Sequence, residues 1–102
     1  MSFFSLFGGG NIKKALQNGA VVIDIRIPNE FDGGKVSGSI NIPLERFTIN
    51  VERLKNMKLP LIVCSNSFYD SSIAVKRLKK AGIKKVYNGG TWTELSKLQR
   101  KI

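Results

Sequence analysis

"LPLIVCSNSFYDSSIAVKRLKKAG", from Leu59 to Gly82, decides the fold. Its apolar, β-branched start predicts a buried strand that ends at Cys64. A polar loop follows, after which Ser71 or Ser72 can cap a helix. That helix carries an apolar stripe at helical spacing, made of Ile73, Ala74, Leu78 and Ala81, and Gly82 stands where helices commonly end. The stretch therefore predicts a strand–loop–helix unit.

The same alternation continues on both sides of this unit. Three further apolar runs predict strands at residues 20–25, 39–43 and 84–88, and helical patterns cover residues 11–17, 44–57 and 92–101. Strands that alternate with helices indicate an α/β fold with a central, mostly parallel sheet flanked by helices. A chain of 102 residues suffices for one domain. We place that domain at residues 11–102, behind an apolar, glycine-rich tail at residues 1–10.

The composition excludes several classes of chemistry. One cysteine cannot form an internal disulfide, and it favours a reducing compartment, for which we expect the cytoplasm. The chain has no histidine, which excludes a Cys–His pair and a histidine-bound metal, so we expect neither a metal nor a cofactor. The apolar stretch at the N-terminus is too short to span a bilayer, and no transmembrane segment is predicted.

The formal net charge is +10, with the basic residues concentrated toward the C-terminus. Such a field attracts anions, whether small oxyanions, an acidic protein partner or nucleic acid. A surface that binds single-stranded nucleic acid needs aromatic side chains on which the bases stack, and no aromatic residues alternate with the basic ones here. Nucleic acid is therefore disfavoured as a partner. A merely solvated basic face remains the alternative.

Cys64 is the candidate reactive group. Backbone amides and a helix start beyond a strand end stabilise a thiolate, which is the form that attacks. The loop that would cradle this anion or a bound substrate consists of Ser65, Asn66, Ser67, Phe68, Tyr69 and Asp70. Without histidine as a base, the reaction that fits is exchange of a sulfur atom through a persulfide. The alternative is an inert cysteine buried in the core.

A second stretch, "DIRIPNEFDGGKVSGSINIP" at residues 24–43, has an Asp-x-Arg start and a Gly-small-Ile-Asn-Ile-Pro end. With the cysteine loop and the later "YNGG", it resembles the single-domain rhodanese-like (sulfurtransferase) family. The resemblance implies a rhodanese-like three-layer fold with Cys64 at the catalytic position. Asp24 and Arg26 point to one face and can tie neighbouring loops together. The resemblance implies that they shape the pocket. Arg26 as an anion-binding group is the alternative.

The sequence departs from the family pattern in three ways. The family loop has four residues between the cysteine and a common Arg or Thr, whereas five residues separate Cys64 from Asp70. The loop contains no Lys or Arg, and an acidic Asp70 disfavours phosphatase chemistry because it repels phosphate. Lys35 replaces a family histidine, and Trp92 lies closer to the Gly-Gly pair than usual.

These observations predict a sulfurtransferase that carries sulfane sulfur on Cys64 and passes it to a thiophilic acceptor. The donor would be a small sulfur-containing anion (thiosulfate or polysulfide) or a protein persulfide. The alternative is a non-catalytic rhodanese-like module whose basic face binds an acidic protein partner.

Overall fold

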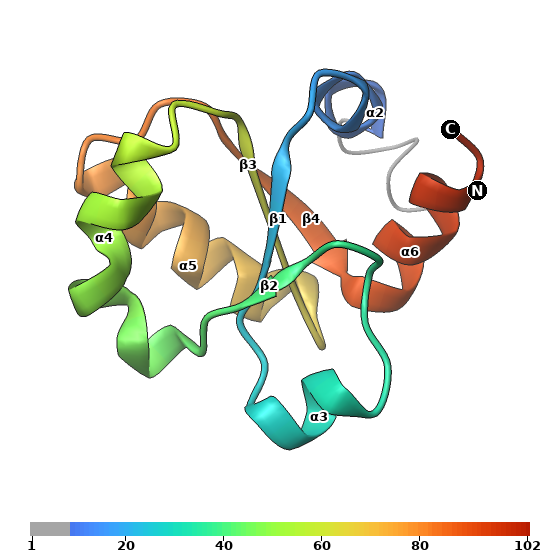
Figure 1. Cartoon of the computed structure of the whole chain (residues 1–102), viewed down its shortest axis with the longest axis horizontal. Coiled ribbons are helices and arrows are strands. Elements are labelled where there is room, and N and C mark those ends of the chain that lie inside the picture. The colour runs from blue at the N-terminus through green and yellow to red at the C-terminus, as the bar shows by residue number, and fades with distance from the viewer. Residues whose placement is uncertain (1–8) are drawn as a thin grey trace.

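The computed structural model describes residues 9–102 as one four-stranded sheet with helices on both faces (Figure 1). All strand pairs are parallel and their spatial order is β2-β1-β3-β4. The strands are β1 (Val21–Asp24), β2 (Ile40–Asn41), β3 (Leu61–Ser65) and β4 (Val86–Thr91). This arrangement confirms the predicted α/β fold with its parallel sheet.

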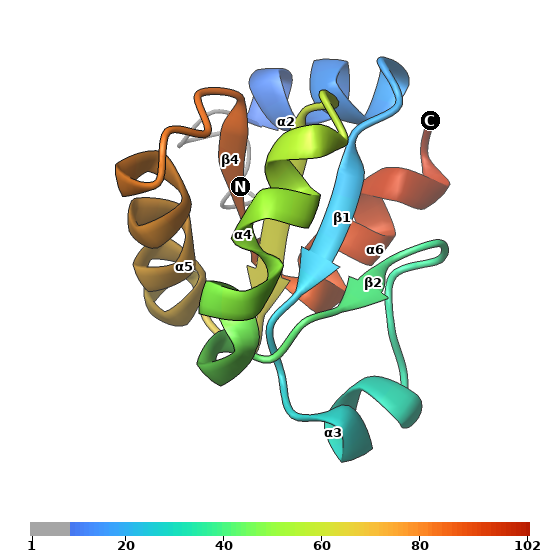
Figure 2. The ribbon, with the colours of Figure 1, turned by 60° about the vertical axis from the view of Figure 1, so that its left-hand side comes forward.

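The helices form the two outer layers. They are α2 (Gly9–Gln17), α3 (Pro28–Asp32), η1 (Leu44–Arg46), α4 (Phe47–Asn56), α5 (Phe68–Lys80) and α6 (Trp92–Arg100). Helices α4 and α5 cover one face of the sheet and α2 and α6 the other, while α3 lies beyond the carboxyl end of β1 (Figures 1 and 2). Among residues 9–102, no helix is both long enough and apolar enough to cross a membrane.

Strand β3 lies between β1 and β4 and is buried along its whole length. Its side chains alternate between the faces of the sheet, as every strand requires. Leu61 and Val63 join the apolar cluster under α4 and α5. Ile62 and Cys64 join the second cluster, which contains residues of α2 and α6.

Several element boundaries differ from the predicted ones. Strand β3 continues through Ser65, so Cys64 is not its last residue. Helix α5 begins at Phe68 and not near Ser71, because the Ser67 side chain accepts a hydrogen bond from the backbone N–H of Asp70 and caps the helix.

Other element boundaries also differ from the predicted ones. The helix predicted at 44–57 is divided into η1 and α4, and the last strand lies at 86–91 and not 84–88. Helix α2 includes Gly9 and Gly10, which the sequence analysis assigned to the tail, and the remainder of that tail lies outside the described residues.

Helices α4 and α5 end in the same way with different residues. After α5, Gly82 has a positive φ of 100° and its N–H donates to the Lys79 carbonyl, which confirms the predicted glycine cap. After α4, Lys58 has a positive φ of 54° and donates to the Lys55 carbonyl. A side chain in this left-handed region costs on the order of 1 kcal/mol, which glycine avoids.

We therefore expect Lys58→Gly to raise the free energy of unfolding by about 1 kcal/mol. Urea denaturation of the two proteins at neutral pH measures this difference. Gly82→Ala serves as the opposite change, because it places a Cβ where φ is positive, and it should destabilise by a similar amount. A Lys58→Gly protein that is less stable than the parent would contradict the strain at this position.

Candidate functional site

The loop after β3 starts from Ser65, whose side chain lies on the face opposite Cys64. The Ser65 hydroxyl donates to the Ser67 carbonyl at 2.8 Å and accepts from the Ser67 N–H at 3.2 Å. It also lies 3.0 Å from the Ser71 hydroxyl, which donates to the Gly90 carbonyl on β4. A chain of serine hydroxyls therefore occupies the centre of the loop and ties it to α5 and β4.

These hydroxyls use backbone amides that the sequence analysis assigned to a bound anion. The N–H groups of Ser67 and Asp70 donate to the side chains of Ser65 and Ser67. Two of the six amides in the predicted cradle are therefore directed at serine oxygens within the loop. Phe68, Tyr69 and Asp70 form the first turn of α5 and not part of a loop.

Cys64 itself is completely buried, with an exposed fraction of 0%. Its neighbours in the apolar cluster include Ile12 and Val36, and Trp92 packs against the same cluster. Burial raises the pKa of the Cys64 thiol far above its ordinary value, and the charge of Asp24 raises it further. The charge of Arg26 lowers the thiol pKa, and a hydrogen bond to Asp24 raises it again by a smaller amount. The thiol is therefore neutral and shielded, which argues against its predicted catalytic role.

The buried ion pair of Asp24 and Arg26 lies next to this thiol. Asp24 is paired with Cys64 in the β1–β3 register. The Nε and Nη2 atoms of Arg26 donate to both Asp24 carboxylate oxygens at 2.8–3.0 Å, and the Arg26 backbone N–H donates to the same carboxylate. Both side chains are almost fully inaccessible to solvent. This pairing is the loop-tying arrangement that the sequence analysis preferred over anion binding.

The remaining donors of Arg26 hold the segment that contains α3. Nη1 donates to the Glu30 carbonyl at 3.1 Å and Nη2 to the Gly34 carbonyl at 2.6 Å. The Trp92 ring lies 4.5 Å from the guanidinium carbon and stacks on it. A Cβ at Gly34 would come within 2.8 Å of the Trp92 ring, so glycine is required there. Each nitrogen of the Arg26 guanidinium therefore donates to Asp24 or to a backbone carbonyl of the segment that contains α3.

The mouth of the loop is a small hollow of about 220 Å³. Ser65 and Arg26 contribute to its wall, together with two acidic residues, Glu30 and Asp70. The Asn66 side chain donates to the Glu30 carboxylate at 2.9 Å and bridges the loop to α3. No lysine lines this mouth in the described part of the chain. Its local charge therefore opposes the binding of a small anion.

Metal chemistry finds no support in the described residues, which contain no group of three side chains able to hold an ion. Three residues of this site have roles that were not predicted from the sequence. Ser71 and Trp92 carry its hydrogen-bond and stacking contacts, and Glu30 lines its mouth. The loop length was the signal in the sequence that could have identified Ser65 as the first residue of the loop. Four residues lie between Ser65 and Asp70, as in the family pattern.

Comparisons with known proteins agree with the fold. The sequence pattern of the family described as "Rhodanese-like domain" matches residues 10–92. A curated protein of Bacillus subtilis (strain 168), "Uncharacterized protein YqhL", is 38% identical over 69 residues, which are 68% of this chain and 54% of that protein. The chain thus spans about half the length of this curated relative.

Solved structures give the same result. A "rhodanese with anions from E. coli" is 26% identical with a TM-score of 0.67, covering 74% of this chain and 89% of its own. The reduced CoADR-RHD of Bacillus anthracis is 28% identical with a TM-score of 0.67, covering 90% of this chain and 16% of its own. A Staphylococcus saprophyticus protein shares the fold at 20% identity with a TM-score of 0.70, over 84% of this chain and 87% of its own.

The raised pKa of Cys64 predicts a loss of stability at alkaline pH. Above the ordinary thiol pKa of 9.0, the unfolded chain loses the proton while the folded chain keeps it, so each further pH unit costs about 1.4 kcal/mol. Below that pH both states are protonated and the group contributes nothing to the pH dependence. Denaturation of the parent and Cys64→Ala between pH 8 and pH 10.5 isolates this effect, because the two proteins differ only at this side chain. Parallel profiles would show that the folded thiol ionises normally.

The ion pair predicts a second effect. Arg26→Met leaves the Asp24 carboxylate buried without a partner and should lower the free energy of unfolding by about 3–5 kcal/mol. Arg26→Lys keeps the charge but loses the two-pronged contact, so a smaller loss is expected. Chemical denaturation measures both, with the exposed Arg100→Met as the matched control. A loss for Arg26→Met no larger than the control would contradict the central role of the pair.

Proposed function

The chain belongs to the rhodanese-like family, and within it we propose that this protein is a binding module that does not transfer sulfur. The observation that carries the proposal is the position of its single thiol. Cys64 is inside the core, while the residue at the head of the loop is Ser65. A hydroxyl at that point cannot carry sulfane sulfur as a persulfide.

The chemistry of sulfur exchange supports this proposal. A persulfide forms when a thiolate attacks the donor's sulfur, so the attacking atom must be both ionised and within reach of the donor. Cys64 meets neither condition, because its proton is held by burial and by Asp24 and its side chain has no exposed surface. An approach from the loop would have to pass through β3 to the opposite face of the sheet.

The loop spacing supports the same conclusion. Four residues lie between Ser65 and Asp70, which equals the spacing of the family pattern, so Ser65 and Asp70 stand where a cysteine and a cation or threonine are usual. The acidic mouth formed by Glu30 and Asp70 fits this replacement. A solved relative is described as a rhodanese with anions, whereas we propose that this mouth does not retain a small sulfur-containing anion.

The charge of the chain indicates what such a module binds. The net charge of +10 produces a positive electrostatic field that attracts acidic partners. The single buried thiol is compatible with a location in the cytoplasm. We therefore favour an acidic protein partner over a sulfur donor. The second candidate function, sulfur transfer through Cys64, is favoured by family membership and is tested directly by the mass of the protein.

The first measurement is intact mass after incubation with thiosulfate or polysulfide. We expect no added sulfur on the reduced, folded parent, and no difference from Cys64→Ala. Gain of one sulfur atom by the parent that is absent in Cys64→Ala would establish the transferase and overturn the binding-module proposal.

A second variant moves the thiol by one residue. In Cys64→Ala/Ser65→Cys the lone thiol stands at the head of the loop, on the mouth side of the sheet. We expect iodoacetamide to alkylate it at least about tenfold faster than the folded parent, because the parent thiol must await opening of the core. Both proteins should react alike once unfolded in guanidinium. Equal rates in the folded state would contradict the placement of the residue 65 side chain in the wall of the loop mouth.

A further inference from the structure

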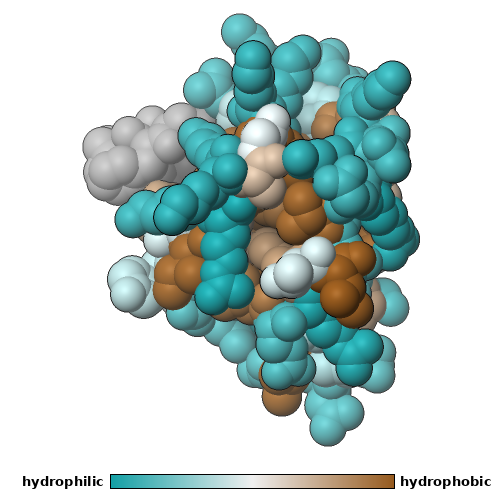
Figure 3. Space-filling view, turned by 90° about the vertical axis from the view of Figure 1, so that its left-hand side faces the viewer, coloured by the Kyte–Doolittle hydropathy of each residue, from teal (hydrophilic) through white to brown (hydrophobic). Residues whose placement is uncertain are grey.

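A second hollow lies at the amino ends of the strands, away from the loop. Its volume is about 520 Å³, within the range of ligand pockets. It is formed where the end of α4 meets the segment before β4, and its apolar lining comes from Leu54, Leu59 and Ile83. Figure 3 shows the face on which α4 and α5 lie, with apolar surface recessed between hydrophilic side chains.

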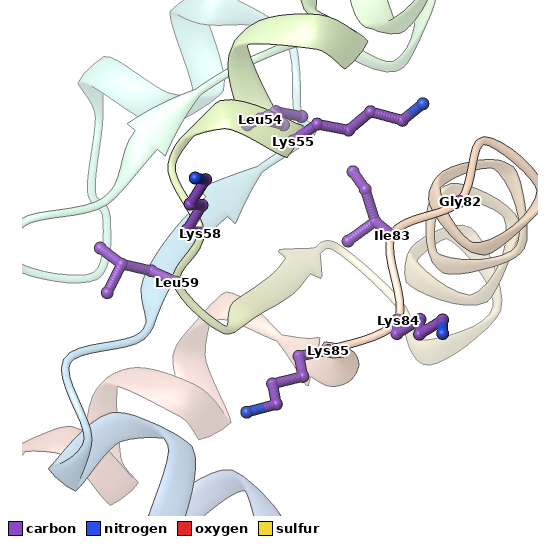
Figure 4. Close-up of a pocket in the computed structure, with 8 residues that line it drawn as sticks. All are labelled: Leu54, Lys55, Lys58, Leu59, Gly82, Ile83, Lys84 and Lys85. Atoms are coloured by element: carbon purple, nitrogen blue, oxygen red, sulfur yellow. The ribbon is translucent and has the colours of Figure 1, made fainter.

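Four lysines surround this hollow: Lys55, Lys58, Lys84 and Lys85. No acidic residue lines it in the described part of the chain. One of these lysines, Lys55, forms an ion pair with Glu52 at 3.8 Å, and both partners are exposed. In Figure 4 the Ile83 side chain points into the space between α4 and the segment before β4, while Lys84 and Lys85 extend to opposite sides. The positive charge therefore forms a rim around an aliphatic floor.

The backbone places one of these lysines at a cost. Among the described residues other than glycine, Lys58 alone has a positive φ. Glycine would suit the helix cap better, but it would remove a cation from the rim. The strain thus adds positive charge at a place where the fold alone does not require it.

We propose that this hollow binds an acidic peptide segment of a partner protein, with one aliphatic side chain of that segment on the apolar floor and its carboxylates against the lysine rim. The inference rests on the proposed binding function and gives it a location and a partner chemistry. Its test measures binding and leaves the thiol untouched, so failure of one proposal does not imply failure of the other.

Charge and shape favour a peptide over other polyanions. A nucleic-acid strand gains much of its affinity from stacking on aromatic rings, and no aromatic side chain lines the hollow. An anionic membrane is bound by several apolar side chains that protrude into it. Here Leu54 is buried and Ile83 is half-buried, so that Leu59, 45% exposed, is the one exposed residue of the three that form the apolar lining. An acidic segment with a single aliphatic anchor can contact the apolar floor through that side chain and the lysine rim through its carboxylates.

The probe is a short, fluorescently labelled peptide that alternates glutamate with leucine, titrated at low salt against the full chain. We expect Lys84→Glu/Lys85→Glu to weaken binding at least about tenfold, because it replaces attraction by repulsion at the rim. The matched control Lys97→Glu/Lys101→Glu makes the same change in net charge on α6 and its end and should alter affinity less than about twofold. Lys58→Gly should weaken binding although it relieves the backbone.

Competing ligands identify the class of partner. A polyglutamate peptide of equal charge and the Leu59→Ser variant should both show weaker binding, because each removes one side of the apolar contact. Amide chemical shifts should change at residues 54–59 and 82–85. Equal losses in the two lysine pairs, tighter binding of a single-stranded oligonucleotide of equal charge, preferential binding to phosphatidylserine vesicles, or no peptide binding at all would each overturn the proposal.

Discussion

The alternation of side chains along β3 controls the chemistry of this protein. Because β3 is an interior strand with helices on both faces, each of its side chains must enter one of two separate layers. A displacement of one residue is therefore a change of face and not a small shift. The alternation sends Cys64 toward α2 and α6 and leaves Ser65 on the side where the loop and α5 begin.

The Asp24–Arg26 pair depends on that same arrangement and extends it to the mouth of the loop. Burial of two charges costs free energy. Here that cost is offset because Arg26 contacts Asp24, two backbone carbonyls and the Trp92 ring. By holding the segment around α3, the pair also fixes Glu30, which meets Asn66 across the mouth. Burial is the main reason why the Cys64 thiol stays protonated, and Asp24 adds to it. Through Arg26, the same carboxylate is linked to the segment that places Glu30 at the loop entrance.

The order of elements and the parallel sheet were predictable from sequence because β-branched runs and the Gly82 cap are local signals. That the loop starts from Ser65 and not from Cys64 was not predicted, because cysteine and serine are both small and fit a strand end equally well. The start of α5 was missed since Phe68 and Tyr69 are exposed and carry no apolar periodicity. The carbonyl partners of Arg26 come from distant backbone, which no spacing of residue types reveals.

Net charge alone does not indicate where an anion binds, because the two ends of the sheet differ. At the carboxyl end, Asp70 in the first turn of α5 offsets the positive end of that helix, and Glu30 adds a second negative charge. At the amino end, the C-terminal ends of α4 and α5 each contribute about half a negative charge. These partial charges ease the repulsion among four lysines, with the Lys55 amine close to Gly82, but do not neutralise them. Four lysines therefore gather at the end of the sheet opposite the rhodanese loop, whereas the mouth of that loop carries two acidic side chains.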